Sequence, residues 1–157
     1  MIITAWRIVK ERHLSTAFTG EGAARYPGRW NERGVPMVYT AASLSLAALE
    51  ILVHVGSDAV LQQYTCIPVK FDAGLCRQVA PSDLPEDWAA EPAPDSTRAL
   101  GSTWTKDSSS AVLAVPSAVV PLESVYLINP LHEDFSRIAI GGESHFRFDA
   151  RLRQSLA

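Results

Sequence analysis

Glu50 is a carboxylate inside one of the two most apolar stretches of the chain, residues 44–55. A carboxylate among apolar side chains is costly unless it is paired or hydrogen-bonded. Helical spacing places Glu50 on one stripe with Ala47 and His54. Two interpretations stay open, because this stripe either faces water, as one face of many helices does, or presents a functional carboxylate to a ligand.

Arg29 is the second candidate, in a glycine-rich segment of residues 15–34 that is predicted to form a long loop. Long loops inside a compact domain are commonly functional or disordered. Gly28 would let the backbone approach a ligand, while the planar guanidinium donates hydrogen bonds to phosphate or carboxylate. The alternative is a surface arginine that stacks on Trp30.

Tyr39 and Ser117 each follow an apolar segment. Tyr39 precedes the predicted helix and is interpreted as a packing residue or a binding residue. Ser117 comes directly after Pro116, where an active-site hydroxyl and a turn-capping serine are equally compatible with the sequence. No Gly-x-Ser-x-Gly motif surrounds Ser117, so a hydrolase nucleophile is not predicted there.

The elements that must position these residues are short. Segments rich in β-branched and aromatic residues predict strands at 4–9, 35–40, 64–71, 111–115, 125–128 and 145–149. A buried helix is predicted up to Val55, with Ser43 as its N-cap and Gly56 as its end. Residues 72–110 contain several prolines and predict short helical turns and loops. Because the strands outnumber the helices and do not alternate with them, the sequence predicts an α+β fold with a mixed β-sheet core.

The composition bounds the function. A chain of 157 residues, 47% apolar and 20% charged, is typical of one folded domain, which we expect to span residues 1–157. The net charge of −3 gives no general cationic field for a long nucleic acid. No signal peptide or membrane span is apparent, so we expect a soluble cytoplasmic protein. The histidine spacings predict no metal site, and Cys66 and Cys76 are expected to be free thiols, although they could pair.

The order of several short motifs is distinctive. They are Trp6-Arg7-Ile8, Gly28-Arg29-Trp30-Asn31, Val38-Tyr39-Thr40, Leu46-Ala47-x-Leu49-Glu50 with His54, Val115-Pro116-Ser117, Asn129-Pro130 with His132, and Phe148-Asp149-x-Arg151-Leu152. This series resembles the RES domain family, whose members are toxins paired with Xre-type antitoxins. Pro27 is a departure, since many members have glycine before the Gly-Arg-Trp motif.

The resemblance implies an ADP-ribosyltransferase-like fold and NAD as the substrate. It implies a catalytic set of Glu50, Arg29, Tyr39 and Ser117, with Trp30, Asn31 and His54 as further NAD-binding residues. In this hypothesis Glu50 stabilises an oxocarbenium-like ribose, Tyr39 stacks on the nicotinamide, and Arg29 pairs with the pyrophosphate or the ribose. Ser117 would donate a hydrogen bond to the substrate or to Glu50.

Three functions therefore remain open. The first is a toxin that cleaves the nicotinamide–ribose bond of NAD and depletes it by hydrolysis or phosphorolysis. The second is a mono-ADP-ribosyltransferase that modifies a cellular protein, and the third is a non-catalytic binding module in which Glu50 and Arg29 form a structural ion pair. The resemblance also implies an Xre-type antitoxin that covers the cleft lined by these two residues.

Overall fold

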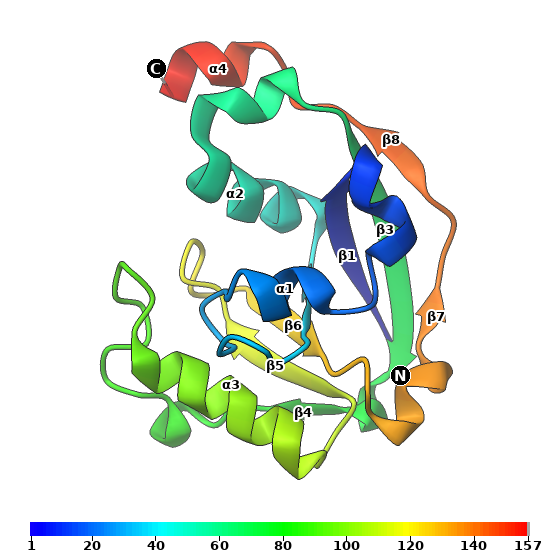
Figure 1. Cartoon of the computed structure of the whole chain (residues 1–157), viewed down its shortest axis with the longest axis vertical. Helices are drawn as coiled ribbons and strands as arrows, with labels where there is room; N and C mark the ends of the chain where they lie inside the picture. The colour runs from blue at the N-terminus through cyan, green and yellow to red at the C-terminus, as the bar shows by residue number, and fades with distance from the viewer. Residues whose placement is uncertain (157) are drawn as a thin grey trace.

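The computed structural model describes residues 1–156, and within them eight strands form one mixed sheet (Figure 1). The strands are β1 (Ile2–Lys10), β2 (Val38–Ala41), β3 (Tyr64–Asp72), β4 (Cys76–Gln78), β5 (Val112–Pro116), β6 (Ser124–Ile128), β7 (Ala139–Ile140) and β8 (Ser144–Phe146). The helices are α1 (Glu21–Arg25), α2 (Leu44–Val55), α3 (Asp95–Asp107) and α4 (Arg151–Leu156). The predicted α+β class is confirmed.

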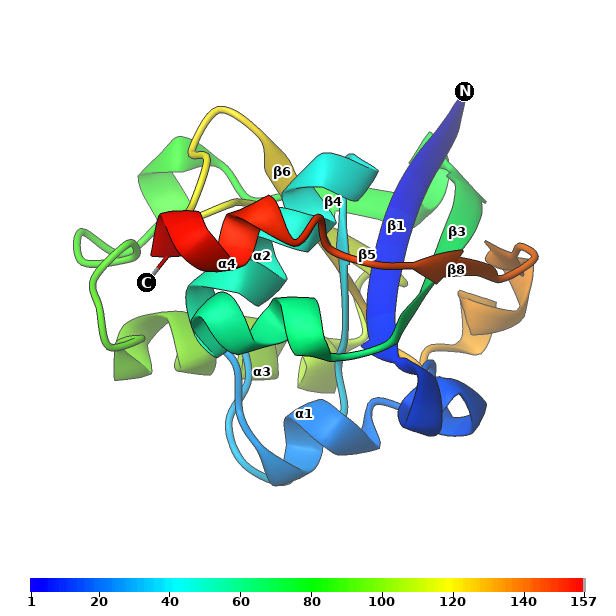
Figure 2. The same ribbon diagram turned by 90° about the horizontal axis from the view of Figure 1, so that it is seen from above.

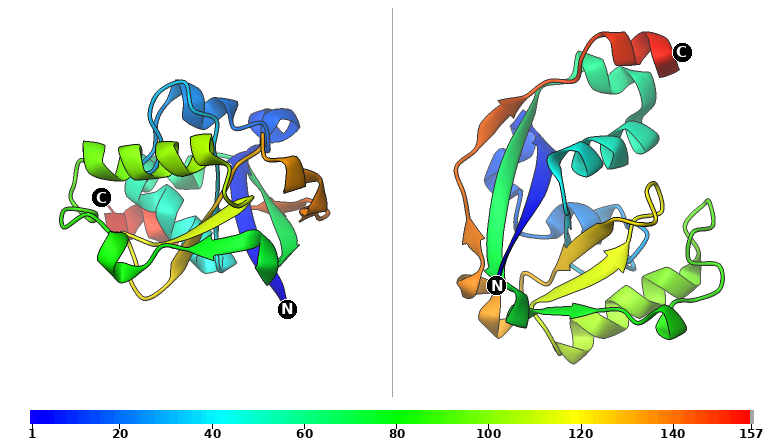
Figure 3. Two further views of the ribbon diagram at one scale, coloured as in Figure 1. Left: turned by 90° about the horizontal axis from the view of Figure 1, so that it is seen from below. Right: turned by 180° about the vertical axis from the view of Figure 1, so that it is seen from behind.

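The sheet has the strand order β4-β5-β6-β2-β1-β3-β7, and β8 also pairs with β3. Only the β4–β5 pair is parallel among the described strands. β1 pairs with β3 along its whole length, from Ile2 opposite Asp72 to Lys10 opposite Tyr64, whereas it meets β2 only at Trp6 and Ala41. β2 therefore joins two differently oriented parts of the sheet, one built on β1 and β3 and the other on β5 and β6 (Figure 3).

Helix α2 begins and ends where the sequence predicts. The Ser43 hydroxyl accepts a hydrogen bond from the backbone N–H of Leu46 at 3.1 Å, and Gly56 ends the helix with a φ of 71°. The expectation that its middle is buried is wrong on one side. Leu46 is buried, but 59% of Val53 is exposed, since only one face packs against the sheet.

By length and composition alone, residues 44–61 would suffice to cross a membrane, and no other described segment does. This 18-residue stretch is not one continuous α-helix. It turns at Gly56 into a short 3-10 segment, and it carries Glu50 and Asp58. Apolar side chains of α2, the following turn and α4 form one cluster on β1 and β3, and Figure 2 places α4 beside the α2 region. Within the structure, 22% of this stretch is buried.

Helix α3 is the main element that the sequence analysis did not resolve, because only short helical turns and loops were predicted for residues 72–110. Its buried face is mostly small and polar, and consists of Thr97, Gly101, Ser102, Trp104 and Thr105. Such a face lacks the apolar periodicity by which an amphipathic helix is recognised. It allows the helix to lie directly on the backbone of the 28–32 segment, where the Ser102 hydroxyl accepts from the Glu32 N–H at 2.9 Å.

Smaller differences concern element ends. β2 begins at Val38 rather than at residue 35, the predicted loop 15–34 contains α1, and the last strand ends at Phe146 rather than at residue 149. Phe148 then turns inward and packs edge-on against Tyr64, with ring centroids 5.3 Å apart. Cys66 and Cys76 are free thiols, as expected.

We predict that Gly101→Ala destabilises the fold by about 3 kcal/mol, because the added Cβ would lie 1.7 Å from the Trp30 carbonyl oxygen. Helix propensity alone would favour alanine by about 1 kcal/mol, so the sign of the effect reports the close approach. Gly22→Ala is the matched control, since nothing lies within 4 Å of its added Cβ. Chemical denaturation of both variants tests this, and a Gly101→Ala variant as stable as wild type would contradict it.

Candidate active site

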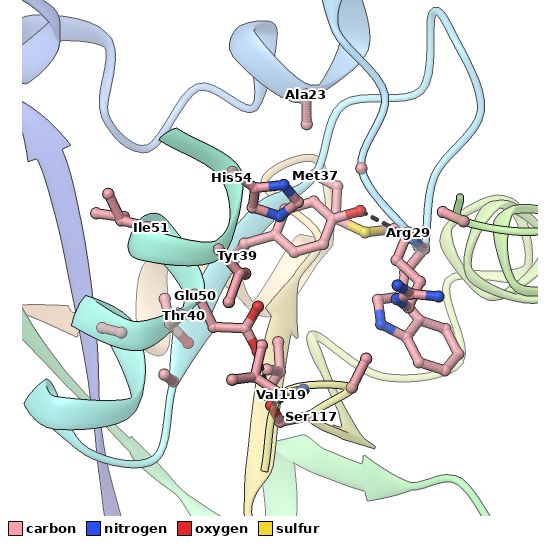
Figure 4. A pocket seen from close by; sticks show the side chains of 18 of the residues that line it. Ala23, Arg29, Met37, Tyr39, Thr40, Glu50, Ile51, His54, Ser117 and Val119 are labelled. Carbon is pink, nitrogen blue, oxygen red and sulfur yellow. Dashed lines mark hydrogen bonds between the residues drawn. The ribbon is translucent and has the colours of Figure 1, made fainter. Parts of the chain in front are cut away.

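A cavity of about 910 Å³ lies between α2 and the segments that α3 supports (Figure 4). Such a volume is in the range of cofactor-sized ligand pockets. Its lining comes from β1, β2, α2, the end of β5, the 20–30 segment and residues 89–98. Six of the seven residues predicted for the site line it, namely Glu50, Arg29, Tyr39, Ser117, Trp30 and His54. Asn31 lies directly behind this lining.

Glu50 and Ser117 form a hydrogen bond across two distant parts of the chain. The Ser117 hydroxyl donates to the Glu50 Oε1 at 2.7 Å, which confirms one of the two partners predicted for this serine. The Ser117 Oγ in turn accepts hydrogen bonds from the backbone N–H groups of Val119 at 3.1 Å and Val120 at 3.0 Å. Ser117 is therefore both a turn cap and the group that orients the carboxylate.

Ser117 and Glu50 differ in how far they are exposed to the cavity. Only 1% of Ser117 is exposed, whereas Glu50 is half-buried at the cavity wall. The stripe proposed from helical spacing is also present, since Ala47, Glu50 and His54 all line the cavity. His54 is exposed and lies one turn beyond Glu50, and Figure 4 shows both side chains on the cavity side of α2.

Tyr39 is held by its hydroxyl. This hydroxyl donates to Asn31 Oδ1 at 2.6 Å and accepts from the Trp30 N–H at 3.0 Å. Burial raises the pKa of Tyr39 well above its usual value, although the Trp30 N–H and the positive charges of Arg98 and Arg29 act in the opposite direction. The phenol therefore stays protonated at neutral pH and keeps its bond to Asn31.

Asn31 is fully buried and organises the loop around Tyr39. Its Oδ1 also accepts from the Gly28 N–H at 2.9 Å, and its Nδ2 donates to the carbonyls of Ala23 at 2.8 Å and Val35 at 3.2 Å. A direct contact between Asn31 and NAD would require breaking these bonds. Trp30 is similarly buried, with 3% exposed, and it packs in the apolar cluster beneath α3.

The structure requires glycine at position 28 for a different reason from the one inferred from the sequence. A Cβ at this position would lie 2.7 Å from the Tyr39 hydroxyl oxygen, so the group that approaches its backbone closely is the tyrosine. No conclusion about a ligand follows from this glycine.

Arg29 binds the segment 88–91. Its Nη1 donates to the carbonyls of Trp88 at 3.1 Å and Ala90 at 2.6 Å, and its Nη2 lies 2.8 Å from the Glu91 carboxylate. The ion pair with Glu50 that the binding-module hypothesis assumed is not formed, because Glu91 is the partner of Arg29. The sequence offered no signal for this contact, since about 60 residues separate the partners.

Two further arginines of the cavity, Arg7 and Arg98, were not predicted as site residues from the sequence. Arg7 on β1 donates to the carbonyls of Ala17 and, at 3.0 Å, Tyr39, and burial lowers its pKa to about 10. It remains cationic at neutral pH. Arg98 on α3 donates through Nε to the Gly28 carbonyl at 3.2 Å. Within residues 1–156, no group of three or more His, Cys, Asp and Glu side chains is placed to hold a metal ion.

Comparison with known proteins identifies relatives along nearly the whole chain. "Toxin Res" of Yersinia enterocolitica is 38% identical over 149 residues, covering 94% of this chain and 98% of the relative. "Prs ADP-ribosylating toxin" of Sphingobium sp. is 38% identical over 157 residues, covering 97% and 98%. "Toxin Res" of Pseudomonas putida is 37% identical over 150 residues, covering 94% and 97%.

The fold has a counterpart among solved structures. A chain in the crystal structure of the M. tuberculosis MbcT–MbcA toxin–antitoxin complex superimposes with a TM-score of 0.77 at 16% identity, covering 99% of this chain and 89% of that chain. The model of the RES domain matches residues 4–150. Together with relatives 37–38% identical along most of the sequence, this match means that the chain belongs to the RES domain family.

Proposed function

We propose that this protein is the toxin of a toxin–antitoxin pair and that it cleaves the nicotinamide–ribose bond of NAD. The observation that carries the proposal is the carboxylate of Glu50, held by Ser117 at the wall of a dinucleotide-sized cavity. The names of the Yersinia and Pseudomonas relatives, "Toxin Res", support the biological role. The name of the Sphingobium relative supports chemistry on an ADP-ribosyl group.

The proposed chemistry needs a negative charge near the ribose. The bond between the ribose C1′ and the nicotinamide nitrogen breaks, and nicotinamide leaves as a neutral base with the electron pair. Positive charge then develops on the ribose, as in other glycosidic cleavages. The Glu50 carboxylate would accept a hydrogen bond from a ribose hydroxyl and stabilise this charge, an effect that partial burial strengthens. Water or phosphate then adds at C1′ and loses a proton.

Ser117 acts in this scheme as a positioning residue. Its hydroxyl is already used by Glu50 and by two backbone N–H groups, and only 1% of the residue is exposed. A carboxylate held in one orientation needs no rearrangement when charge develops on the ribose, and such preorganisation is a major source of electrostatic catalysis.

Tyr39 would place the nicotinamide. Two hydrogen bonds to Asn31 Oδ1, from the Gly28 N–H and the Tyr39 hydroxyl, and one from the Trp30 N–H to that hydroxyl hold the aromatic ring with little freedom. We propose that this ring packs against the nicotinamide and sets the scissile bond near Glu50. His54, on the same face of α2 as Glu50, would contact the bound substrate at the cavity edge.

A second candidate function differs in the acceptor. The Sphingobium relative is named an ADP-ribosylating toxin, which favours transfer of the ADP-ribosyl group to a protein instead of water or phosphate. Both candidates share the first step and the same role for Glu50. An antitoxin partner is proposed from the toxin–antitoxin complex of the M. tuberculosis neighbour. We propose an Xre-type antitoxin that covers the cavity containing Arg29 and Glu50.

We predict that Glu50→Gln lowers nicotinamide release from NAD by about 100-fold or more, since the variant loses the negative charge. Glutamine keeps an oxygen that can accept from Ser117, so the variant should fold and melt close to wild type. Glu143→Gln, an exposed residue outside the cavity, is the matched control and should release nicotinamide normally. Unchanged release by a folded Glu50→Gln variant would contradict the catalytic role of Glu50, and a wild-type protein that releases no nicotinamide would favour a non-catalytic binding module.

The acceptor of the ADP-ribosyl group can be identified with NAD that is labelled in its adenylate part. The purified protein alone should convert it to free ADP-ribose, or to a phosphorylated ADP-ribose when phosphate is present. The same incubation with cell lysate distinguishes the second candidate, because label on a discrete protein band identifies transfer. If label appears on protein and no free product forms, depletion of NAD by hydrolysis or phosphorolysis is wrong as the main activity.

A further inference from the structure

The cavity is richer in positive charge than the chain as a whole. The chain has a net charge of −3, but the cavity lining contains three arginines and two glutamates: Arg7, Arg29, Arg98, Glu50 and Glu91. These arginines are not equivalent, because they differ in how many of their donors already have partners. This difference indicates which guanidinium is available to a bound anion.

Arg98 has more unused donors than the other two arginines, because both of its Nη groups lack a partner among the described residues, against only Nη2 of Arg7 and Nε of Arg29. Its Nε donates to the Gly28 carbonyl at 3.2 Å, which anchors the guanidinium, while its two Nη groups have no hydrogen bond or ion pair within residues 1–156. Arg7, by contrast, donates to two backbone carbonyls from Nε and Nη1. Arg98 is half-buried at the cavity lining, so its free donors are partly desolvated and suited to a charged acceptor.

Arg29 lies next to Arg98 and already holds a carboxylate. The two guanidinium groups are carried by neighbouring backbone segments, since the Thr97 hydroxyl donates to the Arg29 carbonyl at 2.7 Å. The Arg29 partner, Glu91, is 77% exposed although its carboxylate lies only 2.8 Å from Nη2. An ion pair with so exposed a carboxylate contributes little stability, so an anion with higher charge can displace it at small cost.

We propose that Arg98 is the principal donor to the pyrophosphate of the bound dinucleotide, and that the pyrophosphate displaces Glu91 to engage Arg29 as well. This inference rests on the proposed function, since it assigns a subsite to the same substrate. Paired guanidinium donors match the geometry of phosphate oxygens, and both side chains reach the cavity from the α3 side.

The subsite also orients the substrate. Figure 4 shows Arg29 and Glu50 on opposite sides of Tyr39, and Glu50 is carried by α2. With the pyrophosphate at Arg98 and Arg29, the nicotinamide ribose extends past Tyr39 toward Glu50. The adenylate half then lies along residues 89–93, which line the cavity next to α3.

The test compares a ligand that contains a pyrophosphate with a substrate that does not. Arg98→Met should weaken the binding of ADP-ribose, measured by calorimetry, by about tenfold or more, which corresponds to about 1.4 kcal/mol. Cleavage of nicotinamide riboside, which has no phosphate, should remain at the wild-type rate. Arg98→Lys should recover part of the affinity, because it restores the charge without the bond to Gly28. Arg147→Met, at an exposed arginine outside the cavity, should bind as wild type does.

The Glu91→Gln variant independently tests whether the pyrophosphate displaces Glu91 from Arg29. Removing its charge should tighten ADP-ribose binding severalfold, since the pyrophosphate no longer competes with Glu91 for Arg29.

Each contrary result has a distinct meaning. Wild-type ADP-ribose affinity in a folded Arg98→Met variant would overturn the subsite and leave the proposed function standing. Equal losses with ADP-ribose and nicotinamide riboside would reduce Arg98 to a structural role and also overturn the subsite. Weaker ADP-ribose binding by Glu91→Gln would overturn the displacement. If wild type neither binds ADP-ribose nor cleaves NAD, the proposed function itself fails.

Discussion

The hydrogen bond between Ser117 and Glu50 is the interaction on which the candidate site depends. It joins α2 to the turn after β5. Helix α2 packs on the part of the sheet built on β1 and β3, whereas β5 belongs to the part built on β5 and β6. Among the described strands, the backbone pairing between the two parts runs through β2, and the cavity lies on the side where they diverge. A carboxylate at this junction is costly unless it is partnered. The buried hydroxyl supplies a partner while leaving the carboxylate half-buried at the cavity wall.

The opposite wall is built by backbone contacts. The Asn31 side chain donates to the loop carbonyl of Ala23 and accepts from the Tyr39 hydroxyl, so it connects the loop to the tyrosine. Helix α3 lies so close to this loop that only glycine fits at position 101. Arg29 then fastens residues 88–91 to the same loop. Most polar groups near the cavity are thus used for positioning, and Glu50 and Arg98 keep atoms available to a ligand.

The sequence predicted those parts of the fold that have a strong local pattern. Helix α2 was predicted from the Ser43 cap, the leucines and Gly56, and the buried strands from their β-branched residues. Helix α3 was not resolved from the sequence because Thr97, Gly101 and Ser102 form its buried face, where packing on a backbone replaces apolar contact. The Arg29–Glu91 pair and the position of Arg98 depend on long-range packing that no local pattern encodes. The predicted site residues came together, yet the resemblance, rather than their spacing, identified them as a set.

The central claim is that Glu50, oriented by Ser117, accelerates cleavage of NAD. A double-mutant cycle on kcat for nicotinamide release tests it most directly, with Glu50→Gln, Ser117→Ala and the double variant. If Ser117 acts through the carboxylate, Ser117→Ala lowers kcat in the wild-type background but has almost no further effect in the Glu50→Gln background. Equal losses in both backgrounds, or nicotinamide release that neither substitution alters, would contradict the account.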